Sequence, residues 1–151
     1  MLETYLVIFL LAEEAYAIPV SHVQEIQAYA AHEAPRQVPD TPEYFEGIID
    51  LRGEFIPVLD LKQHFGLGKI EPSRKTCYVI VHTPGEKVGI LVDAVLEVQK
   101  VQDGELTPPP ERMLKSIQKD YISGITRLKT KHHDQHNETQ VLHINISKLL
   151  S

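Results

Sequence analysis

Cysteine is scarce in this sequence. Cys77 is the only cysteine among 151 residues, and tryptophan is absent. A single cysteine excludes a disulfide within the chain, which fits a protein of a reducing compartment. Cys77 stands among apolar neighbours in an expected strand over residues 76–82. We therefore expect it to pack as a small buried side chain and not to act as a catalytic thiol, because free cysteines are among the most buried residues.

Long apolar runs are also missing. The run from Leu6 to Leu11 is far shorter than the roughly 20 residues that a transmembrane helix needs. The first four residues, Met1–Thr4, lack the basic region with which a signal peptide begins. From these two features we expect a soluble, cytoplasmic protein without direct membrane insertion.

Positive charge is not in excess. The chain carries 15 Lys and Arg against 21 Asp and Glu, a formal net charge of −6. Proteins that bind nucleic acid without sequence preference rely on a basic surface, so this balance disfavours a nucleic-acid partner. The apolar content of 42% is close to that of ordinary globular proteins, which argues against disorder.

Catalytic and phosphate-binding motifs are not found either. The sequence has no G-x-G-x-x-G, no G-x-x-x-x-G-K-[ST] and no G-x-S-x-G, which are the patterns of dinucleotide, nucleotide and hydrolase sites. Acidic residues do not form a repeated pair, because the counterpart of Asp50 in a similar later block is Arg127. We predict a protein that is not an enzyme and has no cofactor.

One histidine cluster resembles a metal site. His132, His133 and His136 lie with Asp134 in a polar stretch between two expected strands. A structural zinc site needs four ligands on a fixed frame, whereas loops of this kind tolerate change. We therefore predict no functional metal site, and the role of this loop stays open.

What the sequence does contain is an approximate internal repeat. Residues 44–51 and 121–128 both read Y-x-x-G-I-x-x-L, and each block precedes an apolar strand. Two upstream blocks also match in the same order, which favours a duplication with halves at about 4–65 and 76–150. The upstream matches pair Tyr5–Ile8 with Tyr78–Val81 and Ala17–Ile26 with Gly89–Val98.

The apolar runs are short, rich in Val and Ile, and separated by turn residues. This pattern is typical of small β-barrels and sandwiches. Tight turns are expected at residues 51–54 and 83–86, with Gly53 at a position of positive φ. Residues 21–24 resemble a capping box before one or two helical turns. Residues 60–66 predict a short capped helix that ends at a glycine.

Residues 38–61 read VPDTPEYFEGIIDLRGEFIPVLDL and strongly resemble the signature of CheW-like domains. The resemblance covers nearly the whole chain, as a single domain over residues 1–151. It implies an all-β fold of two packed five-stranded SH3-like barrels with short helices, in which the barrels exchange terminal strands. Further matching segments are Tyr5–Phe9, Ala15–Pro19, Val23–Ile26 and Val88–Val95.

The resemblance also implies a function. CheW-like proteins are adaptors that couple the cytoplasmic tip of methyl-accepting chemoreceptors to the regulatory domain of a CheA-type histidine kinase, without catalysis. Asp50 in place of the commoner Asn, a slightly long segment at 27–37 and the His-rich loop are departures that leave the pathway open. The alternatives are a coupling protein of type IV pilus twitching motility, a small-ligand-binding β-barrel module, and a metal-dependent enzyme that uses the histidine cluster.

Candidate contact residues follow from the resemblance and from expected exposure. Arg52 is expected at the tip of a tight turn, where its guanidinium is exposed. Val23 and Ile26 are expected at positions i and i+3 of a helical turn, with counterparts in the second half. The predicted receptor-binding residues are Arg52, Val23, Ile26, Val95 and Val98. The predicted kinase-binding residues are Tyr44, Phe45, Gly47, Gly53 and Phe55.

Overall fold

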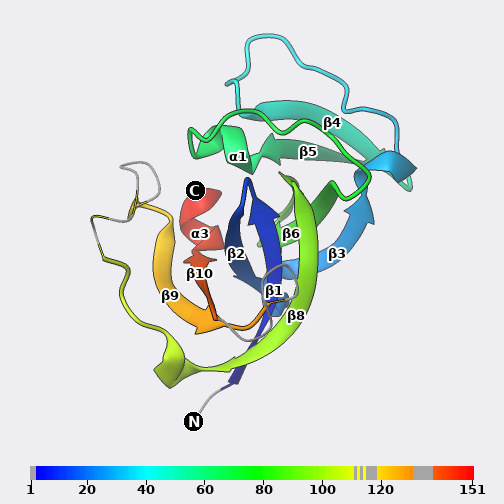
Figure 1. Ribbon diagram of the computed structural model, residues 1–151. Coiled ribbons are helices and arrows are strands. Elements are labelled where there is room, and N and C mark those ends of the chain that lie inside the picture. Colours follow the sequence, from blue (N-terminus) through cyan, green and yellow to red (C-terminus); the bar gives the residue numbers. More distant parts are fainter. Residues whose placement is uncertain (1–2, 111, 113, 115–118, 131–137) are drawn as a thin grey trace. The chain divides into compact units, whose positions relative to one another are not determined.

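The computed structural model describes residues 3–110, 112, 114, 119–130 and 138–151. These residues form ten strands in two five-stranded sheets, with short helical segments between or after the strands (Figure 1). The prediction of an all-β fold with two five-stranded sheets is confirmed. The chain divides into two compact units, of which the first holds residues 1–22 and 95–151 and the second holds residues 23–94.

The sheet of the first unit has the strand order β8-β1-β2-β10-β9. Strands β1 and β2 form an antiparallel hairpin, and β10 runs parallel to β2 and antiparallel to β9. A 3-10 turn, η3 (Asp103–Glu105), follows β8, and α3 (Ile146–Leu149) follows β10. The strands are β1 (Glu3–Leu11), β2 (Glu14–Pro19), β8 (Ala94–Gln102), β9 (Ile122–Leu128) and β10 (Thr139–Ile144).

The sheet of the second unit has the strand order β3-β6-β7-β5-β4. Hairpins β4–β5 and β6–β7 are antiparallel, and β5 runs parallel to β7. The short helical segments are η2 (Tyr29–Ala31) and α1 (Leu61–His64). The strands are β3 (Val23–Ala28), β4 (Phe45–Leu51), β5 (Glu54–Asp60), β6 (Cys77–Thr83) and β7 (Glu86–Val92).

The two sheets share one strand order when the strands are matched by the sequence repeat. Pairing β1 to β5 with β6 to β10 converts the order of one sheet into that of the other. Each unit takes strands from both repeat halves, since β1 and β2 join β8 to β10 while β3 to β5 join β6 and β7. Neither unit therefore coincides with one repeat half. The duplication itself stays a prediction, which this shared order supports.

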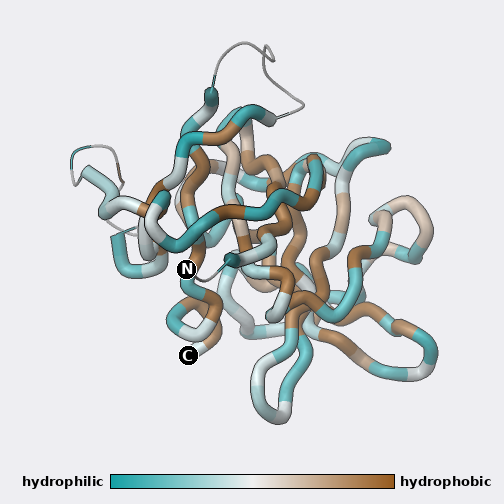
Figure 2. The backbone as a smooth tube through the Cα atoms, turned by 90° about the horizontal axis from the view of Figure 1, so that it is seen from below, coloured by the Kyte–Doolittle hydropathy of each residue, from teal (hydrophilic) through white to brown (hydrophobic). Residues whose placement is uncertain are grey.

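Each sheet has its own apolar core, and Figure 2 shows apolar residues along the strands and hydrophilic residues at many of the connecting loops. In the first unit the core joins side chains of β1, β2, β8, β9 and β10. In the second unit it includes Ile56, Val58, Val79 and Ile90, which are all buried. One core cluster of the first unit contains Leu6, Ile8, Ala15, Ala17, Val101, Leu128 and Val141.

The carboxylate of Asp60 ties α1 to the segment that follows it. Its Oδ1 accepts a hydrogen bond from the backbone N–H of Gln63 at 3.0 Å, which caps the helix. Its Oδ2 accepts from the backbone N–H of Ile70 at 2.9 Å. Gly66 follows the helix with φ of 72°. The predicted short capped helix with its glycine stop is therefore confirmed.

Two local expectations are wrong. Residues 21–24 do not lead into a helical turn, because Ser21 and His22 end the 3-10 turn η1 (Val20–His22) and strand β3 begins at Val23, so Val23 and Ile26 lie on a strand. Pairing of β3 with β6 over residues 23–28 outweighs the local capping preference, as tertiary context often does. Cys77 is only partly buried at the start of β6, where its thiol lies 3.3 Å from the carbonyl oxygen of Lys75.

Candidate functional site

The β4–β5 turn holds two consecutive residues with positive φ. Arg52 has φ of 54° and Gly53 has φ of 85°, the pattern of a two-residue type I′ turn, which suits the twist of a hairpin. The backbone N–H of Gly53 donates to Oδ1 of Asp50 at 2.8 Å. The sequence predicted positive φ at Gly53 but not at Arg52. The turn places the arginine side chain at its tip.

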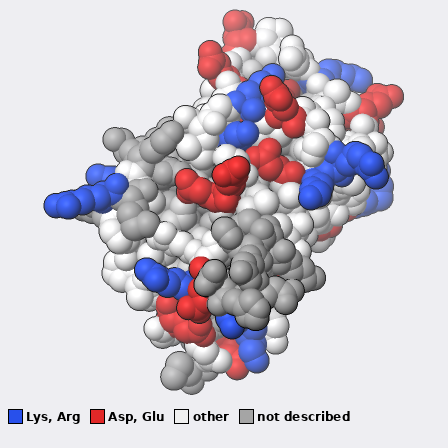
Figure 3. Space-filling model, in the orientation of Figure 1, with Lys and Arg blue, Asp and Glu red and all other residues white. Residues whose placement is uncertain are grey.

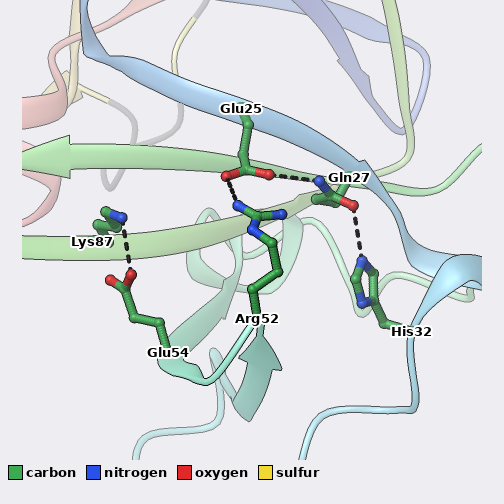
Figure 4. A network of polar contacts seen from close by, with 6 residues as sticks. All are labelled: Glu25, Gln27, His32, Arg52, Glu54 and Lys87. Carbon is green, nitrogen blue, oxygen red and sulfur yellow. Dashed lines mark hydrogen bonds and ion pairs between the residues drawn. The ribbon is translucent and has the colours of Figure 1, made fainter.

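The Arg52 guanidinium lies against the carboxylate of Glu25 on strand β3 (Figure 4). Nη2 of Arg52 is 2.5 Å from Oε2 of Glu25. The hydrogen bond from Arg52, with a second one from Gln27, holds the pKa of Glu25 below its ordinary value, so this carboxylate stays ionised. The Arg52 side chain is 67% exposed and that of Glu25 22% exposed. In this ion pair the Arg52 cation is therefore accessible to a partner, whereas the Glu25 carboxylate is largely covered.

A hydrogen-bonded chain continues from Glu25 along the edge of the unit. Nε2 of Gln27 donates to Oε1 of Glu25 at 2.6 Å. Oε1 of Gln27 lies 3.0 Å from Nε2 of His32. Figure 4 shows the four side chains arriving from β3, from the β4–β5 turn and from the loop after η2. The other carboxylate oxygen of Glu25 is thus occupied by the protein itself.

A second ion pair accompanies the same hairpin. Nζ of Lys87, on β7, lies 3.0 Å from Oε1 of Glu54, the residue that begins β5. Both side chains are at least one third exposed, and exposed pairs of this kind contribute little to folding stability. Figure 3 shows acidic and basic side chains interspersed on the face it draws. The charges near the turn are therefore better placed for recognition than for stability.

A groove of about 540 Å³ runs beside the turn in the same unit. One side of the groove is formed by the segment that contains Arg36. Two backbone hydrogen bonds between Arg36 and Ile48, of 2.8 and 2.9 Å, attach this segment to β4. Phe55 stands at this groove with 69% of its surface exposed. The lining residues are His32, Glu33, Ala34, Arg36, Val38, Ile48, Ile49, Asp50 and Phe55. An exposed aromatic ring at a groove is typical of a protein-docking surface.

Gly47 is required by a close backbone approach. Its φ is 134°, and a Cβ placed there would lie 2.7 Å from the carbonyl carbon of Arg36. Gly47 is buried, and the absence of its side chain lets the backbone of Arg36, which lines the groove, lie close to β4. Gly53, by contrast, is exposed at the turn.

The remaining predicted kinase contacts are less accessible. Tyr44 and Phe45 are partly buried. The ring of Tyr44 packs edge-on against that of His64, with centroids 4.4 Å apart, and burial lowers the pKa of His64. Among the five predicted kinase-binding residues, Phe55 and Gly53 are the exposed ones.

The predicted receptor-binding residues fall in both units. Arg52, Val23 and Ile26 belong to the second unit, and Ile26 is exposed on β3 next to Glu25. Val95 and Val98 belong to β8 in the first unit, where Val98 is the more exposed of the two. The structure thus brings Arg52 together with strand β3.

Sequence reasoning missed Glu25, Gln27 and His32 as site residues. One signal was available, because Glu25 matches Glu97 in the repeat. The match extends to the structure: Nε2 of Gln99 donates to Oε1 of Glu97 at 2.6 Å in the first unit. Both strands β3 and β8 therefore carry a Glu-x-Gln pair joined by the same hydrogen bond.

Neither a metal site nor a membrane-spanning helix is found in the described part of the chain. No group of three His, Cys, Asp or Glu side chains suited to a metal ion occurs among those residues. The cluster His132, His133 and His136 lies outside them. Within the same residues, no helix combines the length and the apolar character needed to cross a bilayer.

Comparison with known proteins gives consistent matches along nearly the whole chain. A model of the CheW-like domain matches residues 5–151. The chain is 28% identical over 144 residues to the chemotaxis protein CheW of Klebsiella aerogenes, which covers 95% of this chain and 80% of that protein. It is 33% identical over 126 residues to the CheW of Treponema pallidum, covering 81% and 72%. The crystal structure of the scaffolding protein TtCheW from Thermoanaerobacter tengcongensis matches with a TM-score of 0.79 and 34% identity, covering 97% of this chain and 86% of that one.

Proposed function

The chain belongs to the CheW-like family of non-enzymatic chemotaxis adaptors, and we propose that it joins the cytoplasmic tip of methyl-accepting chemoreceptors to the regulatory domain of a CheA-type histidine kinase. Family membership confirms the predicted adaptor function and supports a scaffold instead of an enzyme. The proposed location is the cytoplasm, where both partner segments would be accessible.

The proposed receptor contact is supported mainly by the ion pair between Arg52 and Glu25. Of the guanidinium nitrogens, Nη2 bonds Glu25, and an arginine side chain has five N–H donors in a fixed fork. The exposed edge of this fork can donate to carboxylates or backbone carbonyl groups of a partner. Ile26 is exposed on the same strand as Glu25, but neighbouring residues of a strand point to opposite faces, so its side chain faces away from the side of β3 that meets Arg52. A partner helix that presents a carboxylate or a free backbone carbonyl group fits the exposed guanidinium.

The groove beside Phe55 is the proposed kinase contact. An exposed aromatic side chain supplies a large apolar area with few rotatable bonds, which is why aromatic residues are frequent interface anchors. The groove walls add Arg36 and Asp50, which can form polar contacts at its rim. Gly47 and Gly53 serve this contact through the backbone, because they set the groove wall and the turn.

The test is assembly of the ternary complex with the variant Arg52→Glu. The side chain is mostly exposed, so the variant is expected to melt like the wild type. Its new carboxylate would face Glu25 and would repel an acidic acceptor, so the receptor tip should no longer be captured with the kinase. Binding of the isolated kinase regulatory domain is the internal control and should persist. Full receptor-dependent activation of the kinase by Arg52→Glu would exclude Arg52 from the contact.

A further inference from the structure

The chain of side chains from His32 to Arg52 has a fixed hydrogen-bond direction. A carboxylate can only accept hydrogen bonds, so Gln27 must turn its amide NH₂ group toward Glu25. Oε1 of Gln27 then accepts from His32, whose Nε2 must carry a proton. Every donor in the chain thus points toward Glu25, from Arg52 on one side and from His32 through Gln27 on the other.

The far end of this chain is anchored in the body of the unit. The ring of His32 packs edge-on against Tyr78, with centroids 6.3 Å apart. Tyr78 is fully buried in β6. Its ring also packs against the ring of Tyr29, with centroids 5.6 Å apart. His32 is therefore held by a buried aromatic side chain and cannot turn freely, although the loop that carries it is at the surface.

We propose that Gln27 and His32 are positioning residues, which hold the Glu25 carboxylate so that Arg52 is presented to the partner in one orientation. This inference rests on the proposed contact at Arg52 and names the residues that shape it. Neither Gln27 nor His32 needs to touch the partner.

The physical reason lies in the entropy of long side chains. An exposed ion pair is weak because both side chains must give up rotational freedom to meet. Gln27 donates a hydrogen bond to the second carboxylate oxygen of Glu25. This bond limits the rotation of the carboxylate that Arg52 contacts. The guanidinium then loses less freedom on binding a partner, which is how preorganisation raises affinity. The hydrogen bond from Gln27 also contributes to the low pKa of Glu25.

The first unit offers a matched control. Gln99 bonds Glu97 as Gln27 bonds Glu25, with the same 2.6 Å distance. Gln99 also donates to the backbone carbonyl of Lys129 at 2.7 Å. A Gln99→Leu variant therefore removes the same type of bond on the same type of strand, in the unit that lacks Arg52.

The experiment compares Gln27→Leu with Gln99→Leu in the full chain, by two readouts. The pKa of the Glu25 carboxyl group, followed by ¹³C NMR titration without any partner, should rise toward 4.5 in Gln27→Leu and stay unchanged in Gln99→Leu. Affinity for a receptor-tip helical hairpin should fall about three- to tenfold in Gln27→Leu alone. Thermal melts should be close to wild type for Gln27→Leu, which separates positioning from unfolding.

The two readouts distinguish this inference from the proposed function. A Glu25 pKa and a receptor-tip affinity that both equal wild type in Gln27→Leu would overturn the positioning role. Full affinity in Arg52→Glu would overturn the contact at Arg52, whatever the titration shows. His32→Phe keeps the packing on Tyr78 but removes the N–H donor, so it should raise the Glu25 pKa by a smaller amount. A pKa identical to wild type would remove His32 from the positioning pair.

Discussion

Gly47 lies directly under the backbone of Arg36. A Cβ on Gly47 would sit 2.7 Å from the carbonyl carbon of Arg36, and the two hydrogen bonds between Arg36 and Ile48 hold that backbone in place. The approach fixes the segment that forms one wall of the groove beside Phe55. The packing of β4 and the shape of the groove therefore depend on the same glycine.

Replacement of Gly47 by Ala is expected to be among the most destabilising single changes in the chain. Left-handed backbone costs a non-glycine residue about 1–2 kcal/mol, and forcing a methyl group into packed backbone costs about 1–3 kcal/mol more. We expect a loss of about 2–5 kcal/mol in the free energy of unfolding by urea denaturation.

Two other glycines separate these contributions. Gly85 has φ of 83° and open space around it, so Gly85→Ala should show only the backbone cost of about 1–2 kcal/mol. Gly124 lacks a positive φ, but a Cβ there would lie 2.7 Å from the side chain of Leu106 and 3.0 Å from the backbone oxygen of Thr107, so Gly124→Ala shows the cost of a close approach without the backbone cost. If Gly47→Ala lost no more stability than Gly85→Ala, the close approach to Arg36 would not be a constraint.

Asp60→Asn should destabilise the second unit although it keeps a good capping residue. Asparagine can still cap α1 through its oxygen. Its amide NH₂, however, would face the backbone N–H of Ile70, which now donates to Oδ2 of Asp60. A lost bond and two opposed donors predict about 1–3 kcal/mol lower stability in urea denaturation.

Asn145 provides the control for this change. It caps α3 in the first unit through the backbone N–H of Lys148 at 3.1 Å. Asn145→Asp retains the cap and is expected to change the stability by well under 1 kcal/mol. Equal effects of the two substitutions would show that the bond to Ile70 contributes nothing.

Local chemistry explains why much of the fold could be predicted. The turn at residues 51–54 and the capped helix at 60–66 depend on glycine and on a capping carboxylate within a few residues. The all-β class follows from short Val- and Ile-rich runs between turn residues. These features need no knowledge of distant contacts, so the sequence was sufficient for them.

Distant pairing explains what could not be predicted. The register of β3 against β6 is set by residues about 50 positions apart in sequence, so the local capping pattern at 21–24 pointed to a helix. The distribution of strands from both repeat halves between the two sheets has no local signal either, and the exchange of terminal strands was expected only from the family resemblance. Arg52 was identified through the family signature, but its partner Glu25 lies 27 residues earlier, where only its match to Glu97 marked it.

His143 makes stability depend on pH. Its side chain is 8% exposed, and its Nε2 lies 2.9 Å from Oγ1 of Thr126. Burial lowers the pKa of His143 from 6.5 to about 4. Because the unfolded chain binds a proton at higher pH than the folded chain, stability is lost as pH falls from 6.5 toward 4. The loss amounts to about 3 kcal/mol for this group.

The variant His143→Gln tests this dependence. Glutamine can bond Thr126 but does not titrate, so its stability should fall less steeply between pH 6.5 and 4 than that of the wild type. The comparison uses the difference between the two chains, which cancels the contributions of other groups such as His64 and Glu25. Parallel stability curves over this pH range would show that His143 is not the responsible group.

Phe55→Ser should separate kinase binding from folding. The ring is 69% exposed and buries little surface within the unit, so the melting temperature should stay near wild type. An aromatic anchor at the centre of an interface is commonly worth 2 kcal/mol or more, so affinity for the kinase regulatory domain should fall about thirtyfold. Tyr5→Ser, at an aromatic residue 55% exposed in the first unit, is the matched control and should bind normally. Retention of full kinase affinity by Phe55→Ser, or equal losses in both variants, would place the kinase contact away from this groove.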